Sequence, residues 1–224
     1  MIPVKRGMVA IWSDVEAAAR TDYLHWLTRE HAAERVGTEG FEGVRVHRAD
    51  RDDVNRYLIV YDLSRAAVLD SPAYLARLND PTPWSRRIMP GLRNFARGGG
   101  DVVAEAGRGQ GAHVAAFRLG GRPKADPALL EAIVAEDGIC AARLLDVDAA
   151  ATGVPTQERG LRQGDRSFPG LLLVEALDAA ALRAALDRHG AAVRALAGGV
   201  EEASTYTLFF ALQRTELGRA AGGA

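Results

Sequence analysis

Hydrophobic and polar positions near the start of the chain follow a pattern that predicts a strand and then a helix. Residues 8–12 (Met-Val-Ala-Ile-Trp) form a short apolar run, as expected of a buried strand. Ser13 or Asp14 follows, and either side chain is suited to cap a helix. The helical pattern continues to about Val36 and stops at Gly37, a residue type that commonly ends helices.

Three more strands and a second helical region follow in the first half. Residues 41–49 and 57–63 are apolar, with alternation, and flank a charged turn-like segment, which predicts a β-hairpin. Two Ser/Thr-Pro pairs predict a broken helical region over residues 65–95. A last strand is expected near residues 101–105, after a flexible stretch at Gly98-Gly99-Gly100. The predicted order is β-α-β-β-α-β, the ferredoxin-like arrangement.

The second half repeats this order of elements with few shared identities. It is expected to form strands at 111–119, 138–147, 168–177 and 205–213, and helices at 126–136 and 178–196. A four-stranded sheet with helices on one face leaves its other face bare, and two such units can cover each other. We therefore predict an α+β protein of tandem ferredoxin-like repeats, residues 1–106 and 107–224, whose antiparallel sheets pack as an α/β barrel within one chain.

Glycine-rich and arginine-rich segments lie between these elements. Gly98-Gly99-Gly100 and the alternating glycines at 107–111 do not connect a strand to a following helix, so a linker is favoured over a nucleotide-binding loop. Residues 149–166, rich in Gly and Arg, form an insertion between the middle strands of the second repeat. Its part 157–166 has few apolar side chains, and we predict that it is mobile or loosely packed. If this loop were ordered over the first half, its arginines would become candidate contacts for an anion.

Composition excludes several classes of protein. Of the 224 residues, 48% are hydrophobic and 25% are charged, as in ordinary globular proteins. The formal net charge of −1 argues against nucleic-acid binding, which normally needs a concentrated basic surface. No apolar run approaches the ~20 residues that span a bilayer, and the N-terminus lacks the apolar stretch of a secretory leader. We expect a cytoplasmic protein that binds neither nucleic acid nor membrane.

The predicted first helix carries the most unusual cluster of side chains. At about 100° per residue, Tyr23, Leu27, His31 and Glu34 share one face, which points toward the sheet. An imidazole on that face, with a carboxylate in reach, could transfer a proton. Glu34, one turn after His31, could orient the ring, and the Tyr23 hydroxyl could bond a ligand oxygen.

Structural and metal-binding alternatives apply to the same residues. His31 could be a buried core histidine whose ring nitrogens are hydrogen-bonded by Glu34 and the backbone. Arg35 is expected on a solvated face of the helix. Trp26 is expected away from the apolar stripe. No metal site is expected, because His31-x-x-Glu34 has no second matching arm. Haem is also unsupported: His31, His113 or His189 could be an axial ligand, but no attachment motif is present.

Several motifs in the first half resemble the EthD-like branch of the dimeric α/β barrel superfamily. They are Trp12-Ser13-Asp14-Val15, Tyr23-Leu24-His25-Trp26, Glu30-His31-Ala32-Ala33-Glu34-Arg35, Gly40-Phe41, Ser71-Pro72-Ala73-Tyr74 and Pro81-Thr82-Pro83-Trp84-Ser85-Arg86-Arg87. The resemblance covers residues 7–97, and the second half matches only as a degenerate version of the fold. It implies a pocket between helices and sheet, with His31 beside it. Relatives include cofactor-free monooxygenases, polyketide cyclases, lactone isomerases and haem-binding members; the branch is usually a single repeat, whereas here the partner unit is fused.

These observations lead to one favoured function and two alternatives. The favoured function is a cofactor-independent enzyme acting on a small aromatic or polyketide-like molecule, with His31 as acid/base group and Glu34 as its orienting partner. Tyr23, Trp12 and Leu27 are the expected substrate-binding residues. The alternatives are a non-catalytic protein of the same fold that binds a small ligand or serves a structural role, and a haem-binding member. The sequence leaves open both catalysis and a homodimer.

Overall fold

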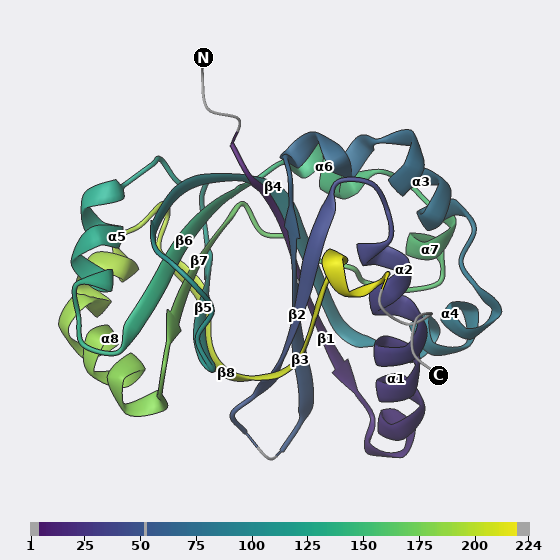
Figure 1. The fold of residues 1–224 in the computed structure, drawn as a ribbon, viewed down its shortest axis with the longest axis horizontal. Helices are drawn as coiled ribbons and strands as arrows, with labels where there is room; N and C mark the ends of the chain where they lie inside the picture. Colours follow the sequence, from purple (N-terminus) through teal and green to yellow (C-terminus); the bar gives the residue numbers. More distant parts are fainter. Residues whose placement is uncertain (1–4, 52, 219–224) are drawn as a thin grey trace.

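The computed structural model describes residues 5–51 and 53–218 (Figure 1). The strands are β1 (Gly7–Val15), β2 (Phe41–Ala49), β3 (Asn55–Leu63), β4 (Arg93–Gly107), β5 (His113–Leu119), β6 (Ile139–Val147), β7 (Gly170–Ala176) and β8 (Val200–Gln213). The α-helices are α1 (Arg20–Trp26), α2 (Ala32–Val36), α3 (Pro72–Asn79), α4 (Pro83–Ile88), α5 (Pro127–Val134), α6 (Ala149–Gly153), α7 (Gln157–Gly160) and α8 (Ala179–Arg194). The 3-10 turns are η1 (Ala17–Ala19), η3 (Ala66–Asp70), η4 (Met89–Gly91) and η5 (Arg214–Glu216), and η2 (Leu27–His31) is a π-helical turn.

The strands form one closed antiparallel barrel in the order β1-β3-β2-β8-β5-β7-β6-β4. Strands β1–β4 and strands β5–β8, with their helices, each follow a β-α-β-β-α-β path. Two seams join the repeats, because β2 pairs with β8 and β4 pairs with β6. The prediction of two ferredoxin-like repeats that close a barrel within one chain is confirmed.

Apolar side chains occupy three layers. The barrel interior is filled by residues of both repeats, such as Met8, Leu58, Leu171 and Tyr206. The other two layers lie between each half of the barrel wall and its helices. Figure 1 shows α5 and α8 on one side of the barrel and α1–α4 on the other. No helix in the part of the chain that the structure describes is long and apolar enough to cross a membrane.

A buried charge network lies inside the barrel, where alternate residues of β2 and β7 point inward. Arg45 Nη1 donates to Glu175 Oε1 at 2.6 Å and Arg45 Nη2 to Asp62 Oδ1 at 3.1 Å, and Arg143 also binds Glu175. Burial alone would raise the pKa of Glu175, but the charges of Arg45 and Arg143 hold it below its ordinary value. His47 is buried nearby, and neither of its ring nitrogens has a hydrogen-bond partner among the described residues.

The first helical region begins later than the sequence pattern predicts. Strand β1 runs through Ser13 and Asp14, so neither residue caps a helix. Asp14 Oδ1 instead accepts a hydrogen bond from Arg56 Nε of β3 at 2.7 Å. The helical region starts with η1, is interrupted by the π-helical turn η2, and ends at Gly37 as predicted.

The π-helical turn changes which residues face the sheet. A regular α-helix puts residues i and i+5 on different faces, whereas a π-helical turn, with its i→i+5 hydrogen bonds, brings them together. Trp26 and His31 are such a pair of positions i and i+5. Residues after the turn are rotated about the helix axis relative to their positions in an uninterrupted α-helix. Arg35 follows the turn and is only 3% exposed, although it was expected on a solvated face. Trp26 precedes the turn and is 2% exposed, because it packs against Tyr23 and donates to Ser85 of α4.

Strand β4 is longer than predicted and contains Gly98, Gly99 and Gly100. A Cβ at Gly100 would lie 2.1 Å from the carbonyl oxygen of Asp146 in β6, and one at Gly98 would lie 2.5 Å from the ring of Phe168. These glycines allow another backbone or an aromatic ring to approach the strand closely. The linker interpretation of Gly98-Gly99-Gly100 is therefore wrong.

The insertion between β6 and β7 packs on the first repeat. Figure 1 shows α6 and α7 beside α3, on the side of the barrel opposite α5 and α8. The backbone N–H of Arg166 donates to the Phe95 carbonyl at 3.0 Å, and that of Arg97 donates to the Arg166 carbonyl at 2.9 Å. Glu158 is only 8% exposed. The predicted loose packing of residues 157–166 is wrong, because the segment finds hydrogen-bond and ion-pair partners far away in the sequence.

Candidate functional site

A cavity of about 230 Å³ lies between the helices of the first repeat, the outer face of its sheet and the insertion. Its apolar and aromatic lining includes Ile11, Tyr61, Leu69, Tyr74, Leu78 and Phe95. Its titratable lining includes His31, Arg35, Arg97, Glu158, Arg162 and Arg166. Because the insertion belongs to the second repeat, both halves of the chain build this cavity.

His31 forms part of the cavity wall and is held by an aromatic neighbour. Its ring stacks on the indole of Trp26, with centroids 4.2 Å apart and an interplanar angle of 27°. The Nδ1 atom of His31 is buried and has no hydrogen-bond partner among the described residues. Burial, followed by the charges of Arg35 and Arg162, holds the pKa of His31 well below its ordinary value. The imidazole is therefore neutral at neutral pH.

A polar network on the far side of Trp26 fixes the indole. Its Nε1 donates to Ser85 Oγ at 3.1 Å. Thr82 caps α4 by accepting from the Ser85 N–H, and its hydroxyl donates to Glu30 Oε1 at 2.6 Å. The capping Thr-Pro pair predicted from the sequence thus helps to position the ring against which His31 rests.

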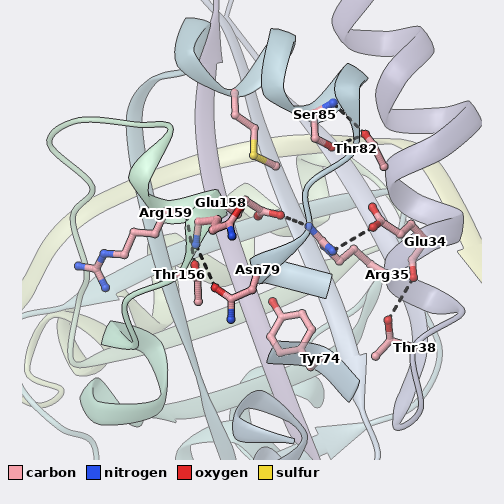
Figure 2. A network of polar contacts seen from close by, with 12 residues as sticks. Glu34, Arg35, Thr38, Tyr74, Asn79, Thr82, Ser85, Thr156, Glu158 and Arg159 are labelled. Atoms are coloured by element: carbon pink, nitrogen blue, oxygen red, sulfur yellow. Dashed lines mark hydrogen bonds and ion pairs between the residues drawn. The ribbon is translucent and has the colours of Figure 1, made fainter. Parts of the chain in front are cut away.

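Arg35 occupies the centre of a buried ion-pair network (Figure 2). Its Nη2 binds Glu158 of α7, and its Nη1 lies 3.7 Å from Glu34 Oε1. Burial raises the pKa of Glu34, despite the opposing charge of Arg35. Glu34 lies beside Arg35, and no hydrogen bond joins it to His31 among the described residues, whereas the sequence pattern predicted that Glu34 orients the ring. Figure 2 also shows that the Arg35–Glu158 pair connects the first helical region to the insertion.

The three residues expected to bind substrate are not part of the cavity lining. Trp12 lies in the barrel interior, where its Nε1 donates to the Tyr206 hydroxyl at 2.8 Å. Tyr23 packs against Trp26 and Tyr57, with ring centroids 5.7 and 5.1 Å away. Leu27 is fully buried in the apolar layer beneath the helices. The pleat of β1 turns Trp12 inward, and the neighbouring Ile11 borders the cavity.

Several residues of the cavity escaped prediction from the sequence. Tyr61 and Tyr74 belong to β3 and α3, and burial raises the pKa of Tyr61. Arg97 of β4 donates to the Thr152 carbonyl at 2.8 Å, and Arg162 lies over the Phe95 ring at 3.9 Å from its centroid. The only sequence signal for this group was the arginine content of the insertion, whose position over the first repeat is a long-range property.

Metal and haem binding fit this chain poorly. Among residues 5–51 and 53–218, no group of three His, Cys, Asp or Glu side chains could hold a metal ion. The cavity beside His31, at about 230 Å³, is below the ~300–1,000 Å³ typical of drug-sized ligands, so haem is too large for it. His113 Nδ1 lies 3.3 Å from the Thr207 hydroxyl, and His189 Nε2 lies 2.9 Å from Glu136. Neither histidine lines this cavity.

Comparison with known proteins shows similarity in fold. No protein-family model matches the sequence, and no curated protein matches it. An "anthrone oxidase-like protein" aligns with a TM-score of 0.62 at 13% identity, over 98% of each chain. A "Putative monooxygenase" from Fusobacterium nucleatum subsp. nucleatum aligns with a TM-score of 0.56 at 12% identity, over 95% of this chain and 96% of the other. A "Putative Chlorite dismutase" aligns with a TM-score of 0.52 at 10% identity, over 96% and 98%.

At these identities the similarity concerns the fold alone. It extends over nearly the whole of both chains in each comparison, so it includes both repeats. The chain has the dimeric α/β barrel fold, built from two ferredoxin-like repeats.

Proposed function

We propose that this protein is a cofactor-independent enzyme that acts on a small aromatic or polyketide-like molecule by acid/base chemistry, with His31 as the proton-transfer group. The observation that carries the proposal is the position of the His31 ring, which lines the cavity built by both repeats. A general base must reach the proton that it removes, and a cavity wall allows that contact.

The surroundings of His31 indicate what kind of proton it can accept. Its Nδ1 is enclosed, so Nε2 is the atom assigned to proton transfer. Burial, and then the charges of Arg35 and Arg162, disfavour the imidazolium, so the ring is unprotonated at neutral pH. The unprotonated imidazole is available to accept a proton, for example one adjacent to the carbonyl of an aryl ketone, and its protonated form returns the proton readily. Trp26 holds the ring in place, the role that the sequence assigned to Glu34.

The size of the cavity limits the substrate. An apolar cavity of about 150 Å³ is enough to bind benzene. The cavity here has about 230 Å³ and an aromatic lining, which fits one substituted ring and excludes a large polycyclic molecule. This fit supports the aromatic part of the proposal, and a polyketide-like substrate would be a short one.

A hydrogen–deuterium exchange assay tests the proposed chemistry. Acetophenone and its 2-hydroxy and 4-carboxy derivatives are incubated with the protein in D2O, and loss of the methyl proton signal is followed by NMR. We expect exchange above the buffer rate with at least one compound, and its loss in His31→Gln. His25→Gln is the matched control, because His25 is on the same helical region but is not part of the cavity lining.

The outcomes separate catalysis from the alternative function. Exchange that persists in His31→Gln removes His31 from the chemistry. If the unaltered protein binds these compounds without proton exchange, the non-catalytic ligand-binding alternative is favoured.

We also propose that the chain belongs to the EthD-like branch of the dimeric α/β barrel proteins. The motifs of residues 7–97 support this membership, whereas the fold comparisons concern a broader group.

A further inference from the structure

The titratable lining of the cavity is unusually rich in positive charge. Five guanidinium groups line it against two carboxylates, which leaves three positive charges in excess when His31 is neutral. The arginines are Arg35, Arg97, Arg159, Arg162 and Arg166, and the acids are Glu158 and Asp165. The chain as a whole has a formal net charge of −1. The local excess is therefore a property of this site and not of the overall composition.

Two of these arginines are neutralised by partners within the protein. Arg35 binds Glu158, and Arg162 binds Asp165 with Nη2 and Oδ2 3.1 Å apart. Arg97 differs from both, because its guanidinium donates to neutral oxygens: the Thr152 carbonyl at 2.8 Å and the Tyr74 hydroxyl at 3.4 Å. Among the described residues, no carboxylate forms an ion pair with Arg97. A half-buried guanidinium without a counter-ion attracts an anion.

Arg166 of the insertion meets the same strand but points to its other face. Residues 95–97 of β4 form a parallel bridge with Arg166 through hydrogen bonds of 2.9 and 3.0 Å, in which Arg166 is the partner of Ala96. Partners in a bridge point to the same face of a sheet, and Ala96 points into the barrel interior. Arg97, the next residue of β4, points to the opposite face and lines the cavity. Arg97 is therefore the arginine of β4 that a ligand in the cavity can reach.

The opposite lining is apolar and aromatic, with Tyr61, Leu69, Leu78 and Phe95. A ligand that complements both sides has one aromatic ring and one compact anionic group. We propose that the cavity selects a single-ring aromatic carboxylate, whose carboxylate is bound by Arg97 and whose ring lies among the apolar side chains beside His31. This inference names the substrate class of the site proposed above and rests on that proposal for the role of His31.

Calorimetric titration of the full-length protein with benzoate and benzamide tests the selection. The two ligands have nearly the same shape and differ in charge. We expect benzoate to bind at least about tenfold more tightly than benzamide, because hydrogen bonds to a charged group are the stronger ones. Arg97→Met should weaken benzoate binding by about tenfold and leave benzamide binding unchanged. Arg97→Gln also removes the charge but keeps a donor for the Thr152 carbonyl, so this variant should fold even if Arg97→Met does not.

The matched control is Arg122→Met, which removes an exposed arginine of the second repeat that pairs with Asp146. It should bind benzoate as the unaltered protein does. Equal affinity for benzoate and benzamide, no detectable benzoate binding, or full benzoate affinity in a folded Arg97→Met or Arg97→Gln protein would each overturn the inference. His31→Gln separates the two proposals: the inference requires that it still prefers benzoate, whereas the proposed function requires that it loses proton exchange.

Discussion

The ring of His31 lies on the indole of Trp26, five residues earlier, with centroids 4.2 Å apart. This contact depends on the π-helical turn Leu27–His31, which puts positions i and i+5 on one face. The same indole donates to Ser85 at the start of α4. Trp26 therefore connects the candidate proton-transfer group to the second helical region of the first repeat.

Replacing Trp26 should destabilise the protein strongly. Trp26→Ala removes a side chain that is 2% exposed, and truncation of a buried Trp costs about 3–5 kcal/mol in the free energy of unfolding. Urea denaturation measures this loss. Trp84→Ala is the matched control, since Trp84 is only partly buried and should cost clearly less. Equal losses for the two variants would contradict the packing described for Trp26.

The Arg35–Glu158 pair should hold the insertion against the first repeat. Arg35→Met leaves Glu158 buried without its partner, and breaking a buried pair in this way costs about 3–5 kcal/mol. The double variant Arg35→Met/Glu158→Met should recover part of that loss, because Glu158 is no longer buried without a partner, although Glu34 still loses the neighbouring charge of Arg35. Hydrogen exchange of residues 157–166 should accelerate in Arg35→Met. Unchanged exchange there would show that the pair does not fix the insertion.

Two buried histidines should make the protein less stable in mild acid. Burial and the charge of Arg45 lower the pKa of His47 from 6.5 to about 4 in the folded state. Above pH 6.5 neither state binds this proton, so His47 adds no pH dependence there. Between pH 6.5 and about 4 the unfolded chain binds it and the folded chain does not. The free energy of unfolding then falls with decreasing pH by about 1.4 kcal/mol per pH unit, and His31 adds to this slope in the same direction.

Denaturation at several pH values from 7 to 4.5 measures that slope. His47→Gln should reduce it by the contribution of one proton, and His31→Gln should reduce it as well. The Glu175 pKa is lowered, so its stabilisation is present above the ordinary glutamate pKa and is lost only at more acidic pH. A slope unchanged by His47→Gln would mean that this ring is protonated in the folded state.

The glycines of β4 should be sensitive to even a methyl group. Gly100→Ala places a Cβ against the Asp146 carbonyl at the seam between the repeats, and such overpacking costs about 1–3 kcal/mol. Gly91→Ala is the control, because a Cβ there meets nothing within 4 Å. Thermal unfolding of both variants measures the difference. A Gly100→Ala protein as stable as the control would contradict the close approach of β4 and β6.

The fold was predictable from the sequence because its signals are local. Strand β2 and the Asp126-Pro127 helix start follow from alternation and capping chemistry, and both are present in the structure. The barrel could be predicted because the order of elements in the first half is repeated in the second half. The glycines of β4 were wrongly predicted to form a linker. They allow the close approach of the Phe168 ring and the Asp146 carbonyl, which come from distant parts of the chain.

The candidate site was predictable only at His31. Its place beside a cavity followed from the helix pattern and the family resemblance. The partners of His31 did not follow: the π-helical turn places Trp26 beside the ring, Glu34 lies beside Arg35, and the pleat of β1 turns Trp12 into the barrel. Arg97 and the arginines of the insertion border one cavity only because the insertion of one repeat pairs with a strand of the other. Such long-range pairing leaves no local signal.

The central claim is that a ligand binds in the cavity shared by the two repeats and contacts His31. NMR spectra of histidine-labelled protein, recorded while benzoate is added, test it most directly, with the His31 signals assigned from His31→Gln. The account predicts that the His31 ring resonances shift as benzoate saturates, because an anion bound at Arg97 and an aromatic ring beside His31 change the field at the imidazole. The signals of His113 and His189, which are not part of the cavity lining, should stay in place. Saturable benzoate binding with unmoved His31 resonances would contradict the account.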